Sequence, residues 1–330
     1  MHIRLGLVPT IVVSSVEAAQ LFLKTHDAVF CSRPKIPASE LISYGNKGVA
    51  FAEYGPYWRH MRKLCTLELL TNAKIEMFEE MRRGEVCGVV EEIKGVGRAG
   101  NSCQGVVNVS YRKRGLAHQM KRINKDLDAL FNKIIDEHMR STKEKQGSDH
   151  KDFINIIMDA SATASLWTLS ELMKHPFALK KAQEELKDVI GLDRMVEEKD
   201  LVKLEYLNIV IKETLRLHPV APLLLPRESV KDIIGNDYLI PKKFANTDID
   251  LYGRNFELIP FGAGRRVCPG LQIGLRSIQL VLAQLLHCFN WELPNSVLSP
   301  CDLDMGMEFG LVVSRAKHLF AKPSSKGCVV

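Results

Sequence analysis

One cysteine in this chain stands in a setting that suits a metal ligand. Cys268 follows the glycine-rich stretch Phe261-Gly-Ala-Gly-Arg-Arg-Val and comes just before Pro269 and a long apolar run. Gly262 and Gly264 allow a tight turn with backbone angles that other residues rarely adopt. Pro269 suits the first position of a helix. The N-terminus of such a helix favours negative charge on the sulfur, and a shielded thiolate can serve as an axial ligand of haem iron.

The residues around this cysteine form a family pattern. They match F-x-x-G-x-R-x-C-x-G, and the matching residues are Phe261, Gly264, Arg266, Cys268 and Gly270. The pattern resembles the cysteine-ligand loop of the cytochromes P450, with the plant A-type as the nearest likeness. The resemblance implies that Cys268 ligates the iron of haem b, that the other four residues help to bind the cofactor, and that Arg266 holds a haem propionate.

Two further segments carry residues of types that bind carboxylates. Trp58 and Arg62 are four residues apart, hence on one face of a predicted helix. They resemble the family's W-x-x-x-R, which implies contact with a haem propionate. Arg227 follows a proline-rich apolar run and resembles another propionate-binding position. On the residues alone, the spacing of Trp58 and Arg62 favours a core tryptophan beside a solvated arginine.

The helix predicted over Lys203–Leu217 carries Glu213 and Arg216 on one face. Taken alone, such a pair is a surface ion pair of little energetic value. The resemblance to the family's E-x-x-R implies instead a buried structural pair that braces the core behind the haem.

The candidates for catalysis on the opposite side of the haem are weaker. In the family, an acid and a hydroxyl on a long helix relay protons. Asp159 aligns with the acid and Ala160 stands where the hydroxyl is expected, so Ser161 or Thr163 would have to supply it. An ordinary helix with small residues fits equally well.

Apolar candidates for substrate contact follow the E-x-x-R helix and recur near the C-terminus, although such residues are more often plain core; they are Val220, Ala221, Leu223, Leu311 and Val312.

The chain as a whole predicts a mainly α-helical fold with minor β-structure, an incomplete cytochrome P450-like fold in one domain over residues 1–330. Helices are predicted over 16–26, 53–100 (interrupted at Gly84, Gly88, Gly95, Gly97 and Gly100), 116–145, 154–173, 176–190 (with Gly191 as its C-terminal stop), 203–217 and 271–288. Residues 3–8 and 10–14 predict a β-hairpin around Val8-Pro9, residues 229–252 predict short strands and turns, and residues 294–318 predict a terminal hairpin region. Against the family pattern, segments are missing near 110/111, 153–159 and 243/244. The last of these would have held an arginine that completes a triad with Glu213 and Arg216.

Composition restricts the other possibilities. The chain is 46% hydrophobic and 25% charged with a net charge of +6, which is ordinary for a globular protein. Its basic residues are spread out, so no nucleic-acid partner is expected. Eight cysteines without C-x-x-C spacing indicate reduced thiols. No apolar run is long enough for a membrane anchor, so we expect either the family's location on the cytosolic face of the endoplasmic reticulum or the cytoplasm.

Two hypotheses about function follow from the resemblance. The first is a haem-thiolate monooxygenase, in which O₂ and NADPH-derived electrons, supplied through NADPH–cytochrome P450 reductase, hydroxylate a small apolar plant metabolite. The second is a truncated, catalytically inactive haem-binding chain or a misfolded fragment. The missing segments and Ala160 favour the second hypothesis, and the sequence leaves both open.

Overall fold

The computed structural model describes residues 2–5, 8–35, 39, 45–98, 107–108, 151–235, 238–240, 245–247, 256, 258–294, 296–310 and 312–327. The chain divides into two compact units, each assembled from two separate stretches. Unit 1 consists of Met1–Lys74 and Pro219–Gln272, and unit 2 consists of Ile75–His218 and Ile273–Val330.

Unit 1 contains a four-stranded sheet in the order β1-β2-β7-β4. Strands β1 (His2–Leu5) and β2 (Val8–Val12) pair antiparallel, which confirms the predicted hairpin. Val8 and Pro9 belong to β2 and not to the turn. Strand β7 (Ala245–Thr247) lies parallel to β2 and antiparallel to β4 (Arg227–Glu228). A second antiparallel pair in this unit joins β5 (Ile233–Gly235) to β6 (Tyr238–Ile240).

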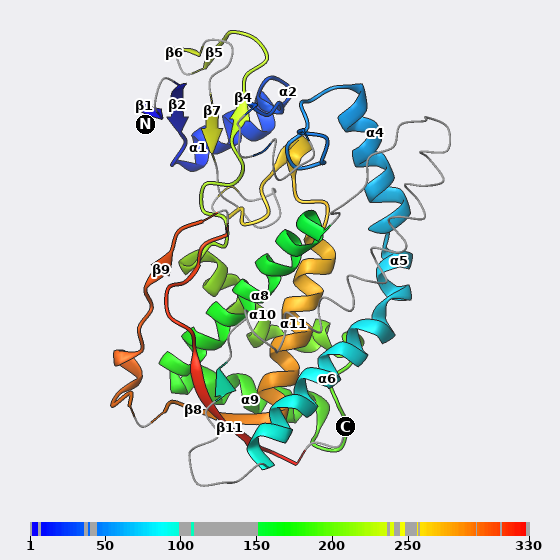
Figure 1. Cartoon of the computed structure of the whole chain (residues 1–330), viewed down its shortest axis with the longest axis vertical. Coiled ribbons are helices and arrows are strands. Elements are labelled where there is room, and N and C mark those ends of the chain that lie inside the picture. Colours follow the sequence, from blue (N-terminus) through cyan, green and yellow to red (C-terminus); the bar gives the residue numbers. More distant parts are fainter. Residues whose placement is uncertain are drawn as a thin grey trace. The chain divides into compact units, whose positions relative to one another are not determined.

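The helices of unit 1 are short, and those before residue 31 lie beside this sheet (Figure 1). Their bounds are α1 (Val16–Gln20), a π-helical turn (Leu21–Thr25), α2 (Asp27–Phe30), α4 (Pro56–Leu64), a second π-helical turn (Cys65–Leu69) and α5 (Asn72–Met77), which runs past the end of the unit. Phe22, Leu23 and Phe30 form an apolar core with Ile259 and Ala263. Since Ile259 and Ala263 lie at the start of the cysteine loop, this core fixes the loop against the π-helical turn and α2.

Unit 2 is built mainly from helices that run through it side by side (Figure 1). They are α6 (Glu79–Arg98), α8 (Lys151–Lys174), α9 (Pro176–Ile190), α10 (Glu205–Leu217) and α11 (Leu271–Cys288), whose first two residues belong to unit 1. Helix α11 begins and ends at the predicted residues, and its second half is buried almost throughout. Helix α9 ends as predicted at Gly191, which adopts a left-handed φ of +82°.

One helix prediction is wrong. Gly84, Gly88, Gly95 and Gly97 were expected to interrupt the segment, yet α6 runs through all four. The helix buries a stripe that includes Val89, Val90 and Ile93. Packing of this stripe outweighs the low helix propensity of glycine. The helix predicted over 116–145 and the breaks near 110/111 and 243/244 lie outside the described residues, whereas 153–159 belongs to α8.

Strands cover one end of the unit 2 helices (Figure 1). Strand β11 (Phe320–Ser325) pairs antiparallel with β8 (Phe289–Glu292) and with β3 (Val107–Asn108). The predicted hairpin near the C-terminus is confirmed as β9 (Met307–Glu308) against β10 (Ser314–Arg315). Short 3₁₀ turns complete the described structure at Glu198–Lys203, Gly264–Arg266 and Pro300–Asp302. Across the described ranges, we find no helix with the length and apolar character needed to span a membrane.

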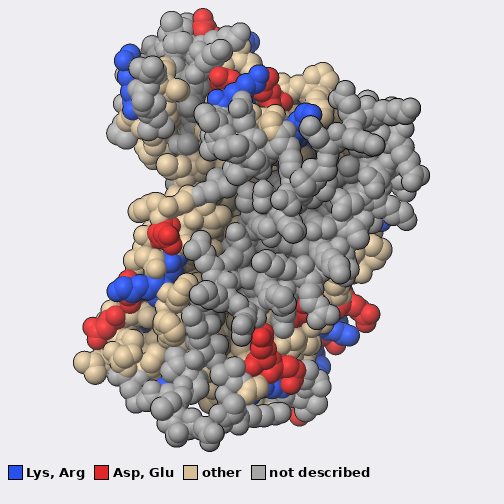
Figure 2. Space-filling model, viewed as in Figure 1, with Lys and Arg blue, Asp and Glu red and all other residues tan. Residues whose placement is uncertain are grey.

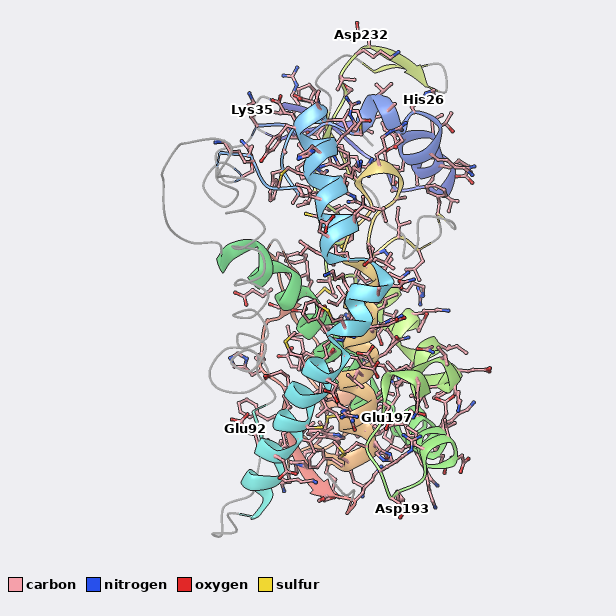
Figure 3. All side chains as sticks on the ribbon, turned by 90° about the vertical axis from the view of Figure 1, so that its right-hand side faces the viewer. His26, Lys35, Glu92, Asp193, Glu197 and Asp232 are labelled. Carbon is pink, nitrogen blue, oxygen red and sulfur yellow. The ribbon has the colours of Figure 1, made fainter. Side chains whose placement is uncertain are left out.

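A buried carboxylate organises the connection between α9 and α10. Asp200 is 1% exposed and accepts hydrogen bonds from Arg194 (2.6 and 2.9 Å) and from the backbone N–H of Glu197 (3.0 Å). Glu197 in turn caps the 3₁₀ turn that follows (Figure 3). The hydrogen bonds from Arg194 lower the pKa of the Asp200 carboxyl.

We predict that Asp200→Asn lowers the free energy of unfolding by about 1–3 kcal/mol, because Arg194 loses its charged acceptor. Since the folded-state pKa of Asp200 is depressed, this contribution is present at neutral pH and is lost as the pH falls through that pKa. Urea denaturation at several pH values measures both effects. Glu292→Gln, at an exposed carboxylate of β8, is the control and should shift stability by no more than about 0.5 kcal/mol. An equal loss in both variants, or a loss for Asp200→Asn that persists in acid, contradicts the prediction.

Candidate haem-binding site

The Cys268 loop is held by a short series of backbone hydrogen bonds in unit 1. The N–H of Gly262 donates to the carbonyl of Ile259 (2.9 Å), and the N–H of Cys268 donates back to the carbonyl of Phe261 (2.8 Å). Between them, Gly264–Arg266 forms a 3₁₀ turn. The loop therefore closes on itself, and it presents Cys268 three residues before α11.

The two glycines predicted to shape the loop both adopt left-handed conformations. Gly262 has φ +69° and Gly264 has φ +68°, a region open to glycine and costly for other residues. A Cβ atom on Gly264 would clash with the carbonyl oxygen of Leu23 and lie 2.6 Å from Oδ1 of Asp27. Pro269, expected at the first helical position, lies instead in the turn before α11.

The surroundings of Cys268 act on its thiol in opposite directions. Burial raises the pKa of the Cys268 thiol, whereas the backbone N–H of Gly270 and the guanidinium of Arg62 act to lower it. The side chain is thus half-buried and faces one hydrogen-bond donor and one positive charge. A soft metal in this place would displace the proton and bind the thiolate.

Arg266 lies in the interior, as its predicted role requires. It donates to the backbone carbonyls of Cys31 (2.6 Å), Ala52 (2.6 Å) and Val49 (3.3 Å). Its guanidinium carbon lies 4.2 Å from the centre of the Trp58 ring, a cation–π geometry. Burial lowers the pKa of Arg266 to about 10, with further lowering from neighbouring arginines.

Two more arginines are buried in the same unit. Arg227 donates to Oδ1 of Asp27 (3.2 Å) and to the carbonyl of Ala263 within the loop (2.8 Å). Arg33 donates to the carbonyls of Ala50, Leu225 and Pro226. Burial, followed by the charges of Arg227 and Arg266, holds the pKa of Arg33 well below its ordinary value. Arg33 was not predicted from the sequence. The available indication was a single charged residue at the end of the stretch Val29-Phe-Cys-Ser-Arg, which the structure buries throughout.

These arginines allow a test of whether haem b suits the site. Arg33, Arg227 and Arg266 are each 7% exposed or less, and Arg62 is half-buried. Asp27 pairs with Arg227 and with the half-exposed Arg265, so among the described residues the guanidinium charges gathered here exceed the one buried carboxylate. Two propionates beside a cysteine ligand would supply the missing negative charge. The residues of unit 1 therefore fit haem b.

The predicted helical pair Trp58 and Arg62 occupies one face of α4. The Arg62 guanidinium carbon lies 6.0 Å from the centre of the Trp58 ring. The indole N–H donates to the carbonyl of Val49 (2.8 Å). Trp58 thus supports Arg62 and Arg266 through its ring face, and direct contact of either α4 residue with a propionate stays a prediction.

The Glu213–Arg216 pair forms in unit 2, but its expected burial is wrong. Two hydrogen bonds of 2.7 and 2.8 Å join the side chains, which are 52% and 55% exposed. The buried face of α10 consists of Leu207, Ile211, Thr214 and Leu215, and the pair lies on the other face. The i, i+3 spacing of Glu213 and Arg216 was sufficient to predict the ion pair, whereas burial of the pair depends on which segments cover the helix.

The remaining predicted residues are distributed over both units. Ser161 is buried in α8, while the side chain of Asp159 lies outside the described part of the chain. Val220 is buried, Ala221 half-buried and Leu223 mostly exposed, all in unit 1 with the Cys268 loop. Val312 is half-buried in unit 2, and Leu311 lies outside the described residues. Their catalytic and substrate roles stay predictions.

Comparison with known proteins agrees with this geometry. The family model for cytochrome P450 matches residues 1–111, 158–249 and 243–320. The chain is 41% identical to cytochrome P450 CYP736A12 of Panax ginseng, over 98% of this chain and 86% of that protein. It is 34% identical to a germacrene A hydroxylase of Saussurea costus, with the same coverage. The chain belongs to the cytochrome P450 family, the haem-thiolate monooxygenases, and these two relatives are plant proteins.

The fold agrees as well. A solved structure of a zebrafish cytochrome P450 superposes with a TM-score of 0.72, covering 99% of this chain and 95% of that one at 20% sequence identity. The mainly helical, P450-like fold predicted from the sequence is confirmed.

We predict that Gly264→Ala destabilises unit 1 and impairs haem uptake. The left-handed backbone alone costs about 1–3 kcal/mol for a residue with a side chain, and the new methyl group would also clash with Leu23 and Asp27. Urea denaturation and haem titration measure the two losses.

Gly84→Ala on α6 is the matched control, because a Cβ there meets no atom within 4 Å. It should stabilise the helix by about 0.5–1 kcal/mol. Wild-type stability and haem uptake in Gly264→Ala would contradict the close packing at this glycine.

Proposed function

We propose that this chain binds haem b through Cys268 and acts as a plant monooxygenase on a small apolar metabolite. The observation that carries the proposal is the Cys268 loop, shaped by two left-handed glycines and held in the same unit as a cluster of buried arginines. Among the described residues of unit 1, the buried arginines outnumber the buried carboxylates. The two propionates of a bound haem would account for this excess of positive charge.

The residues of the chain would divide the work as follows. Cys268 would ligate the iron, with Gly270 N–H and Arg62 stabilising negative charge on its sulfur. Arg33, Arg227 and Arg266 would neutralise the propionates. When bound, the haem supplies activation of O₂, favoured by electron donation from the thiolate. Ser161 on α8 is the candidate hydroxyl for proton transfer, with Asp159 as the candidate acid.

The substrate class rests on the relatives. They include proteins named for germacrene A, 5-epiaristolochene and phenylacetaldehyde oxime. Val220 and Ala221 are apolar candidates for the pocket wall in unit 1. By membership of the family, electrons would come from an NADPH-dependent reductase at the cytosolic face of the endoplasmic reticulum. The net charge of +6 suits an acidic partner, although Figure 2 shows both signs intermixed over the described atoms of the face drawn.

A second candidate function is haem binding without turnover. The alignment with the Panax ginseng protein runs over 430 positions, whereas this chain has 330 residues, so about 100 aligned positions have no residue here. The family model also matches in separate pieces, and their ends fall near the breaks predicted from the sequence. The exposure of Glu213 and Arg216 supports the same candidate. Segments that exclude water from the oxygen-binding side would then be lacking.

We predict that the haem-reconstituted, reduced chain gives a thiolate-type Soret band with CO, and that Cys268→Ser abolishes this band because the axial sulfur is gone. Cys65→Ser is the matched control, since Cys65 is also half-buried in unit 1, and it should keep the band. Absence of haem uptake by the wild-type chain would reject both candidate functions.

Turnover separates the two candidates. With a plant NADPH-dependent reductase, the monooxygenase should form hydroxylated product from germacrene A, 5-epiaristolochene or a related apolar compound. NADPH consumption without product would favour the non-catalytic candidate. Sequencing of the transcript across Ser110, Asp159 and Lys243 tests whether the missing segments belong to the natural message.

A further inference from the structure

The proposed function gives no role to one buried carboxylate of unit 1, Asp27. Asp27 opens α2 and is 4% exposed. A buried carboxylate costs considerable free energy unless it is paired and hydrogen-bonded, so its contacts indicate what keeps it there. Its hydrogen-bond donors Arg227 and Arg265 lie 200 and 238 residues further along the chain.

The two oxygens of Asp27 contact different parts of the site. Oδ1 accepts from Nη1 of Arg227 at 3.2 Å. Oδ2 accepts from the backbone N–H of Arg265 at 3.0 Å and from Nη1 of the same residue at 2.9 Å. One carboxylate therefore joins the arginine of β4 to the backbone of the Cys268 loop.

The loop closes this arrangement from its own side. Arg227 donates to the carbonyl of Ala263, the residue before Gly264. A side chain at Gly264 would meet the carboxylate of Asp27. Asp27 thus contacts Gly264 and Arg265 directly and holds Ala263 through Arg227. Cys268 follows three residues after Arg265.

We propose that Asp27 is a positioning residue that sets the approach of the Cys268 loop and the orientation of Arg227. The proposal rests on the proposed function, in which Cys268 ligates the haem iron and Arg227 faces a propionate. Asp27 itself need touch neither the cofactor nor the substrate.

Charge gives the proposal a second consequence. Asp27 is the anionic partner of Arg227 and Arg265 in a region that also holds Arg33 and Arg266. Its removal leaves a more positive field around the iron ligand, which favours the more reduced, more negative state of the centre. Loss of Asp27 should therefore move the iron reduction potential in the positive direction, whereas a loss of stability alone predicts no particular direction for this potential.

The test replaces Asp27 by asparagine, which keeps the shape and removes the charge. At equal haem occupancy, we expect Asp27→Asn to lose part of the thiolate-type band of the reduced CO complex, to shift the reduction potential positively and to release haem about tenfold faster, a change of ~1.4 kcal/mol. Asp200→Asn is the matched control. Asp200 is a buried carboxylate that also pairs with an arginine and accepts a backbone N–H, but it lies in unit 2. It should lower stability and leave all three haem readouts at wild-type values.

A milder variant keeps the proposal testable if Asp27→Asn does not fold. Arg265→Gln removes the half-exposed guanidinium contact and keeps the backbone N–H that Asp27 accepts. We expect a smaller loss of the thiolate-type band and about twofold faster haem release, because the hydrogen bond from the backbone N–H of residue 265 to Asp27 remains.

The outcomes separate this proposal from the proposed function. A wild-type chain without a thiolate-type band rejects the proposed function itself. A wild-type chain with the band, together with unchanged spectra, potential and haem release in the folded Asp27 or Arg265 variant, overturns the positioning role alone. Equal spectral losses in Asp27→Asn and Asp200→Asn also overturn it, because they would reflect general destabilisation.

Discussion

The interior of unit 1 depends on how its buried guanidinium groups are neutralised. A buried charge without a partner costs several kcal/mol, and Arg33, Arg227 and Arg266 are all buried there. Carbonyl oxygens, the face of Trp58 and one carboxylate supply part of the compensation. Carbonyl oxygens accept the hydrogen bonds but leave the net charge of the arginines in place. The pKa values of Arg33 and Arg266 are therefore lowered by burial and by repulsion between neighbouring arginines. An anionic cofactor would resolve this excess of positive charge.

The left-handed glycine Gly264 belongs to the same constraint. Its missing side chain lets the loop approach α2 closely enough for Asp27 to accept the N–H of Arg265. A bulkier residue would separate the loop from α2 and leave the carboxylate without its backbone donor. Backbone conformation, charge pairing and the position of Cys268 are therefore coupled through a few atoms, and a change at any of them affects the others.

Much of this could be predicted from local pattern, and the failures have a common cause. The loop glycines, the bounds of α11 and the stop at Gly191 are set by residues close together in sequence, so the sequence predicted them. The roles of Arg33 and Asp27 depend on partners about 200 residues away, and such contacts leave no periodic trace. The spacing of Glu213 and Arg216 is the same whether the pair is buried or exposed, so only the neighbouring segments decide. Helix α6 shows the converse error, because a buried stripe overrides four glycines.

Cofactor binding and turnover make different demands on this chain, and its residues satisfy them unequally. Binding needs a ligand, neutralised propionates and a loop of fixed shape, and in the proposed function all three would come from residues within unit 1. Turnover also needs a dry pocket and a placed proton donor, since water that reaches the oxygen site diverts the reaction. The alignment gaps concern this second set of demands. A chain of this kind can therefore retain the full spectroscopic identity of its family while losing the coupling of electrons to product, and haem binding alone is not evidence for catalysis.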